Sequence, residues 1–165
     1  RANFNFSEDD LNAAKKRLDK IYRLKKRVLG AAANLSANEK FKSEFMSAMG
    51  DDLNTSKALA CVDEFVRSAN DELDANPKDK AKKGEIAANL ELIARVLGIL
   101  QVDVFEYFQF GVSDEKRAYI EDLINQRNEA KAAKNYELSD KIRDMLAANG
   151  ISLMDTPNGC MWEKI

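Results

Sequence analysis

Apolar residues recur every three or four positions through most of this chain, and polar or glycine-containing segments divide the pattern into stretches. That spacing places apolar side chains on one face of a helix, whereas a half-buried strand shows strict alternation. The pattern predicts helices over residues 8–29, 37–49, 56–73, 85–100, 114–134 and 136–148. After Gly150, residues 151–154 have strand character, 155–159 have turn composition, and 160–165 are expected to pair back as a hairpin.

Short polar residues stand where several of these helices begin. Ser7, Thr55 and Ser113 each precede an apolar stripe, and such side chains accept a hydrogen bond from a free N–H group of the first turn. Ser36–Glu39 has the spacing of a capping box. Residues 74–84 are mostly polar and are expected to form a loop.

The predicted fold is mainly α. The first four helices carry one apolar stripe each and are joined by short to moderate links, which suits an antiparallel up-and-down bundle. We therefore expect a helical bundle over residues 1–104, an aromatic linker over 105–112, and a small helix-plus-β-hairpin domain over 113–165. The linker contains Phe105, Tyr107, Phe108 and Phe110. These rings could form a platform for bases, but hydrophobic contact between the bundle and its neighbour is the favoured interpretation.

The composition restricts the chemistry. There is no histidine, so the commonest general base is missing. Cys61 and Cys160 lie far apart in the sequence, and neither a disulfide nor a zinc site is expected from them. Asp51 and Asp52 could be read as a metal pair, but two carboxylates without other ligands favour a turn. We expect no catalytic residue, cofactor site or metal site in this chain.

No apolar run approaches the roughly 20 residues of a membrane span, and no secretory signal is present. We therefore expect a cytoplasmic protein. The first residue is Arg1 rather than methionine, which suggests a piece of a longer chain.

Charge is unevenly distributed around a net value of −2. Residues 1–40 carry ten Lys or Arg against five Asp or Glu, whereas residues 113–165 carry eight against ten. The basic face of the first helix is interpreted as solvated, and contact with an RNA backbone is the alternative. Any nucleic-acid binding by residues 113–165 has to depend on locally placed side chains, because that segment has no broad basic field.

One predicted helix carries a chemically mixed face. Tyr136, Asp140 and Arg143 fall at i, i+4 and i+7, so a ring, an acceptor and a forked donor share one side. Those groups can hold an unpaired base and read its edge. On spacing alone, an intrahelical Asp140–Arg143 pair beside a core tyrosine is the favoured alternative.

The preceding helix has an apolar stripe that turns basic at Arg127, Lys131 and Lys134. These cations either compensate the helix dipole, worth about 0.3–1 kcal/mol each, or extend beyond the core to meet RNA. Asp155, beside the proline-containing turn, could accept a hydrogen bond from a cytosine amino group. Capping its own turn is the alternative role.

Three sequence blocks, in order, resemble bacterial cysteinyl-tRNA synthetases. Residues 134–146 and 150–162 are similar to K-x-[YW]-x-x-[SA]-D-x-[IA]-R-D-x-L and G-I-x-L-x-D-x-P-x-G-x-x-W of the C-terminal anticodon-binding segment. Residues 49–60 resemble M-D-D-D-F-N-T-P-x-A-L-A of the helical domain, although Ser56 and Lys57 replace the usual Pro and Glu. Residues 1–7 are similar to the R-x-P-L-N-F-S that follows the catalytic core.

The resemblance implies a C-terminal fragment that comprises the helical and anticodon-binding domains. It implies that the GCA anticodon stem-loop of cysteine tRNA is bound by Arg127, Lys131, Tyr136, Asp140, Arg143 and Asp155. The family commonly has arginine at the position of Lys131. A lysine cannot form a bidentate fork to guanine, so phosphate contact is the contact expected there.

The family's chemistry belongs to its catalytic domain. The H-I-G-H and K-M-S-K-S elements and the zinc ligands lie upstream in these enzymes and are absent here. The resemblance therefore implies ATP and zinc for the full-length enzyme, and a monomeric, catalytically inactive fragment that works with its own catalytic domain. A helical protein-interaction module without RNA specificity is the alternative. A related enzyme that joins cysteine to a small amine is disfavoured by the C-terminal hairpin.

Overall fold

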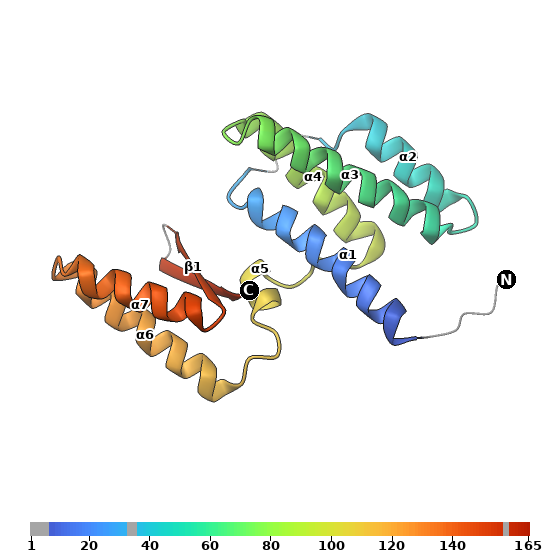
Figure 1. Cartoon of the computed structure of the whole chain (residues 1–165). Helices are drawn as coiled ribbons and strands as arrows, with labels where there is room; N and C mark the ends of the chain where they lie inside the picture. Colours follow the sequence, from blue (N-terminus) through green and yellow to red (C-terminus); the bar gives the residue numbers. More distant parts are fainter. Residues whose placement is uncertain (1–6, 33–35, 157–158) are drawn as a thin grey trace. The chain divides into compact units, whose positions relative to one another are not determined.

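The computed structural model describes residues 7–32, 36–156 and 159–165. The first block of the resemblance, apart from Ser7, lies outside the described residues, as do Pro157 and Asn158 of the expected turn. The chain forms two compact units, Arg1–Gln101 and Val102–Ile165 (Figure 1).

Four helices make up the described part of the first unit. They are α1 (Glu8–Arg27), α2 (Glu39–Gly50), α3 (Thr55–Ala75) and α4 (Lys80–Leu97). The α3 helix contacts each of the other three, and α2 also contacts α4. Figure 1 shows α2 and α3 side by side. The bundle expected from the apolar stripes is therefore present, with α3 at its centre.

The core of this unit is formed by side chains from all four helices. The most deeply buried are Ile21, Leu24, Phe45, Val62, Leu73, Ile86 and Ile93. Phe41 joins α2 to α3, because its ring stacks on Phe45 of the same helix at 5.5 Å between centroids and lies tilted against Phe65 of α3 at 4.7 Å. Burying one large apolar side chain stabilises a fold by roughly 1.5–3 kcal/mol, so these stripes account for the assembly of the bundle.

The first half of α1 contributes little to this core. Ser7 caps the helix as predicted, and its hydroxyl accepts a hydrogen bond from the Asp10 N–H group. Leu11, which opens the apolar stripe in the sequence, is 57% exposed. Burial in α1 is confined to its C-terminal part, at Ile21, Tyr22 and Leu24.

Several predicted boundaries are wrong by a few residues. The caps of α2 and α3 are Asn38 and Asn54, whose side chains accept from backbone N–H groups three residues later, and not Ser36 and Thr55. The polar loop expected at 74–84 is shorter, because α3 continues to Ala75 and α4 begins at Lys80 behind an Asp79 cap. In each case a nearby Asn or Asp side chain provides the capping acceptor.

The second unit combines helices with a hairpin. Its elements are α5 (Val104–Phe108), α6 (Asp114–Ala132), α7 (Tyr136–Ala148), β1 (Ile151–Thr156) and β2 (Gly159–Lys164). The strands are antiparallel, with Leu153 opposite Trp162 and Asp155 opposite Cys160. The mainly α fold with a C-terminal hairpin is therefore confirmed. The short α5 helix, within the expected linker, was not predicted.

Trp162 lies in the core of this unit and is only 4% exposed. Its cluster takes side chains from α6, α7 and β1, namely Ile120, Leu123, Ile124, Ile142, Leu146 and Ile151. Trp162 of β2 therefore shares one apolar core with the two helices that precede the hairpin. The α6 and α7 helices lie against each other, and α7 lies against β1.

A buried glutamine connects the two ends of this unit. The Gln109 side chain, which follows α5, donates from Nε2 to the Trp162 carbonyl at 2.9 Å. Its Oε1 accepts a hydrogen bond from Arg117, whose guanidinium carbon lies 5.4 Å from the centroid of the Trp162 ring. The segment that opens the unit is thus bonded to the strand that ends it.

Trp162 is the single tryptophan, so its fluorescence reports unfolding of the second unit. We expect Leu146→Ala, at a side chain that is 1% exposed, to lower the free energy of unfolding by about 2–5 kcal/mol because it leaves a cavity. Urea titration followed by Trp162 emission measures this. Met145→Ala, on the same helix but 38% exposed, should cost less than about 1 kcal/mol. Equal losses would contradict the burial described here.

Candidate nucleic-acid interface

Arg127, a buried residue of α6, contacts the hairpin. Arg127 Nη1 and Nη2 donate to the two carboxylate oxygens of Asp155, at 2.9 and 3.0 Å. The Arg127 side chain is only 6% exposed, whereas the Asp155 side chain is 56% exposed. Cys160, the cross-strand partner of Asp155, lies 3.6 Å from Arg127 Nη1 through its sulfur. The arginine therefore holds the carboxylate from the inside, and the carboxylate faces solvent.

Lys131 reaches the same carboxylate from one turn further along α6. Its Nζ lies 2.8 Å from Asp155 Oδ2. The hydrogen bonds from Arg127, and then from Lys131, hold the pKa of Asp155 well below its usual range, although partial burial opposes them. Asp155 remains an acceptor at any physiological pH, and the alternative role of capping its own turn is not needed to explain its position.

Arg127 has one unsatisfied donor. Its Nε is buried and has no hydrogen-bond partner among the residues that the structure describes. Leaving a buried donor unpaired costs roughly 1–3 kcal/mol. The side chain nevertheless adopts this position, in which the hydrogen bond with Asp155 is the main cause of the raised pKa of Arg127. The sequence suggested that the basic end of the α6 stripe reaches the surface at Arg127. The structure instead places this side chain in the interior.

The helix α7 presents the other candidate residues. Tyr136 is 63% exposed and therefore not a core tyrosine, which corrects one part of the alternative interpretation. The Asp140–Arg143 pair, which is the other part of that interpretation, is present but loose. Arg143 Nη1 lies 3.6 Å from Asp140 Oδ1, and both side chains are more than half exposed. The Asp140 carboxylate also raises the pKa of Arg127 through its charge. The ring, the acceptor and the donor are all open to solvent.

Backbone geometry fixes where Tyr136 begins its helix. Lys134, just before the cap, has a φ of 58°, in the left-handed region that non-glycine residues rarely adopt. Asn135 then caps α7, and its side chain accepts from the Leu138 N–H group at 3.2 Å. This tight turn directly follows α6, so the candidate residues of α6 and α7 come from neighbouring, contacting helices.

A hollow of about 480 Å³ lies beside the hairpin, between α6 and β2. Its walls include Asn125 and Asn128 of α6 and Met161 of β2. Sequence reasoning did not single out these asparagines. Their spacing on the exposed face of a helix, one turn before Lys131, is the signal that could have identified them.

Comparison with known proteins gives two kinds of match. The family described as DALR domain matches residues 44–101. The chain is 60% identical over 164 residues to a cysteine–tRNA ligase of Campylobacter concisus, covering 99% of this chain and 35% of that protein. It is 61% identical over 163 residues to the cysteine–tRNA ligase of Campylobacter hominis, with the same shares covered. The enzyme of Helicobacter pylori is 50% identical over 165 residues.

This chain belongs to the cysteine–tRNA ligase family. It spans about a third of the length of these relatives. The DALR match falls on α2, α3 and α4 of the first unit, whereas the candidate residues lie in the second unit. The family resemblance expected from the motifs is therefore confirmed.

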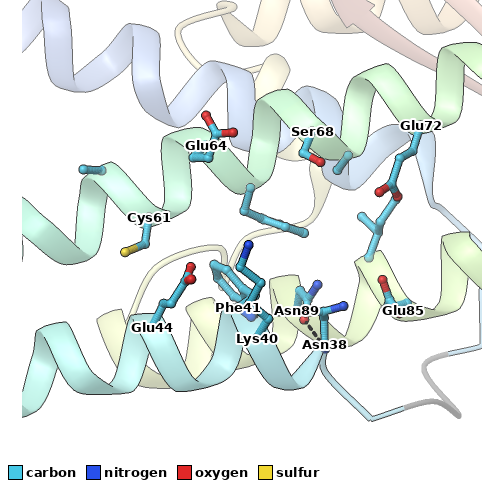
Figure 2. A pocket seen from close by; sticks show the side chains of 14 residues that line it. Asn38, Lys40, Phe41, Glu44, Cys61, Glu64, Ser68, Glu72, Glu85 and Asn89 are labelled. Carbon is cyan, nitrogen blue, oxygen red and sulfur yellow. Dashed lines mark hydrogen bonds between the residues drawn. The ribbon is translucent and has the colours of Figure 1, made fainter.

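A second pocket, of about 460 Å³, lies in the helical unit between α2, α3 and α4 (Figure 2). Glu44, Glu64, Glu72 and Glu85 line it, with Lys40 as the single cation among its lining residues. Figure 2 also shows the hydrogen bond between Asn38 and Asn89 at its lower edge. Lys82 pairs with Glu72 and Glu85, and Arg67 pairs with Glu64, so most of these carboxylates are already neutralised.

No group of three or more His, Cys, Asp or Glu side chains is arranged to hold a metal ion within residues 7–32, 36–156 and 159–165. Asp51 and Asp52 form a turn, in which Asp52 and Leu53 have φ values of 52° and 53°. In the part of the chain that the structure describes, no helix is long and apolar enough to cross a membrane.

The lowered pKa of Asp155 has a testable consequence. A carboxylate whose pKa is lower in the native state stabilises the fold above its ordinary pKa of about 3.9, and this stabilisation is lost as the pH falls. We expect Asp155→Asn to unfold at lower urea concentration than the original chain at pH 7, with the difference shrinking between about pH 5 and pH 2. Asp144→Asn is the control, because Asp144 is 74% exposed and 3.6 Å from Arg143. A difference that is constant with pH would contradict the ion pairs of Asp155.

Proposed function

We propose that this chain is the C-terminal, tRNA-binding part of a cysteine–tRNA ligase, and that it recognises the GCA anticodon of cysteine tRNA. The relatives are cysteine–tRNA ligases, which supports cysteine tRNA as the partner. The observations that carry the proposal are the exposed ring of Tyr136 and the exposed carboxylate of Asp140 on α7, together with the exposed Asp155 carboxylate that Arg127 and Lys131 of the contacting helix α6 hold. Such groups suit loop RNA, whose unpaired bases are stacked and read at their edges.

The remainder of the enzyme would carry the chemistry. ATP-driven activation of cysteine and its transfer to tRNA, together with the zinc site, are assigned to a catalytic domain outside this sequence. The chain alone would be inactive, and the helical unit would serve as a spacer between that domain and the anticodon reader. The chain would act as a monomer in the cytoplasm.

Each candidate residue has a distinct proposed role. The Tyr136 ring would stack on an unpaired base, and the nearby Asp140 carboxylate would accept from a base amino group. Arg143, on the next turn, would contact a base edge or phosphate. At the hairpin, Asp155 would accept a second amino group, and Lys131 would contact phosphate as a point charge.

The structure changes the proposed role of Arg127. A side chain that is 6% exposed and already donates twice to Asp155 is poorly placed to contact a base itself. We assign it as the residue that positions Asp155. Its planar fork fixes both carboxylate oxygens, which a lysine could not do.

Binding of the chain to the cysteine anticodon stem-loop tests the proposed function. We expect tighter binding to the GCA loop than to a loop with a changed first base, measured by fluorescence anisotropy at one stated salt concentration. Residues 113–165 have a slight acidic excess, so the absolute affinity can be modest while the preference remains. Equal binding to both loops would refute base reading. RNA binding insensitive to both sequence and salt would favour a protein-interaction module.

Asp140→Ala should remove discrimination at one anticodon base without loss of fold. Its side chain is 65% exposed, and its contact with Arg143 is 3.6 Å long, so little stability depends on it. Binding to stem-loops changed at each anticodon position measures the discrimination, and thermal melting measures the fold. A collapsed melting transition would show instead that Asp140 has a structural role.

Tyr136→Ala should weaken binding to the anticodon loop by about 1–3 kcal/mol, because stacking on one base is lost. Tyr136→Phe should retain most of the affinity, since the ring is kept. Tyr119→Ala is a matched control on α6, because that tyrosine is 54% exposed and is not among the candidate residues. Equal losses in the Tyr119 and Tyr136 variants would exclude a specific stacking role for Tyr136.

A further inference from the structure

The hollow between α6 and β2 is lined by residues to which the proposed function gives no role. Its volume of about 480 Å³ lies within the range of small-ligand pockets. We propose that this hollow is a nucleobase site that binds the adenine of the anticodon loop, and this proposal rests on the proposed function. Asn125 and Asn128 would form hydrogen bonds to the edge of the base.

The two asparagines are placed as a pair. Glu121, Asn125 and Asn128 follow one another at i, i+4 and i+7, so they share one exposed face of α6 and line the hollow together. Neither amide makes a hydrogen bond to any residue that the structure describes. Each offers two donors and an acceptor. The wall of the hollow therefore presents hydrogen-bond donors and acceptors that are not used within the described chain.

These asparagines have no evident structural purpose. Asn38, Asn54 and Asn135 cap helices, whereas Asn125 and Asn128 lie inside α6. Asparagine is a weaker helix former than alanine. Two such residues within one helix, without intramolecular hydrogen bonds, destabilise it relative to alanine, which is consistent with selection for contact with a ligand.

The lining selects a neutral base over a phosphate. No lysine or arginine is among the lining residues, and Glu121 contributes a carboxylate. A phosphate would be repelled there, but a base amino group would find an acceptor. Ile124, Met161 and Trp162 also line the hollow and supply apolar surface for the face of a ring. The site therefore suits a flat, uncharged ligand that carries an amino group.

Adenine matches the amide groups best. It presents an amino donor beside a ring-nitrogen acceptor, which is the pattern that an asparagine side chain pairs with in two hydrogen bonds. On its O6 and N7 edge guanine presents two acceptors, so an asparagine side chain cannot form the same pair of hydrogen bonds there. The GCA sequence contains one adenine, so the hollow would add a further point of reading beside Asp140 and Asp155.

The hollow continues into the Asp155 cluster. Cys160 lines the hollow and is the cross-strand partner of Asp155. On α6, Asn128 lies three residues before Lys131, so the two side chains emerge from the same side of the helix. One nucleotide at Asp155 and Lys131 would leave a neighbouring base within reach of the hollow.

A double variant, Asn125→Ala with Asn128→Ala, tests the site in the full chain. Binding is measured to the GCA stem-loop and to the same loop with purine, which lacks the amino group, in place of adenine. We expect the original chain to prefer adenine by roughly tenfold or more, and the double variant to lose that preference. Gln126→Ala is the control, because this amide on the same helix pairs with Asp122 and does not line the hollow.

The outcomes separate the two proposals. If the original chain discriminates at the other anticodon positions and the double variant keeps its preference for adenine, the hollow is not the adenine site and the proposed function stands. If the original chain discriminates at no position, the proposed function fails, and the adenine site fails with it. Thermal melting of both variants shows that the fold is kept, which is expected because alanine favours the helix.

Adenosine itself provides a readout that does not depend on the stem-loop. Titrated into the original chain, it should shift the side-chain amide signals of Asn125 and Asn128 in nitrogen–proton correlation spectra, and purine riboside should shift them much less. The Gln126 amide signals should remain in place. Equal shifts with both nucleosides, or none with adenosine, would overturn the adenine site.

Discussion

The fork from Arg127 to Asp155 is the polar contact that joins α6 to the hairpin in the second unit. It joins α6 to the hairpin through two hydrogen bonds, from a guanidinium that is 6% exposed to a carboxylate that is 56% exposed. Two strands alone are marginally stable in water, so the hairpin needs this bond and the packing of Trp162 to hold one position. Among the described residues Arg127 Nε has no partner, so the side chain forms the fork although one of its hydrogen-bond donors stays unpaired.

Polar side chains have separate tasks in the two units. In the helical unit, Asn38, Asn54 and Asp79 cap the N-termini of α2, α3 and α4, and the core is mostly apolar apart from the buried Asn89. In the second unit, carboxylates, amides and cations gather at the surface of α6, α7 and β1, where capping does not require them. This division agrees with a rigid support that carries a small polar surface.

Much of this fold could be predicted from the sequence, because apolar spacing dictates helix faces and Gly150 marks the change to strands. The helix Tyr136–Ala148 was predicted to the residue, since Asn135 and Gly150 flank a clear stripe. The caps of α2 and α3 were not, because Ser36 and Thr55 have competitors within two residues. The burial of Arg127 could not be predicted from the sequence either. It depends on the position of Asp155, which is set by the pairing of β1 with β2. The hollow needs three-dimensional placement of β2 beside α6, which no local pattern contains.

The bond from Gln109 to the Trp162 carbonyl closes the second unit on itself. The amide lies directly after α5, at the start of the unit, and its acceptor lies in the final strand, 53 residues further along the chain. Residues 104–109 therefore belong to the support of the hairpin as much as α6 and α7 do. A shorter fragment that began at Ser113 would keep the helix-plus-hairpin elements but leave the Trp162 carbonyl without this donor.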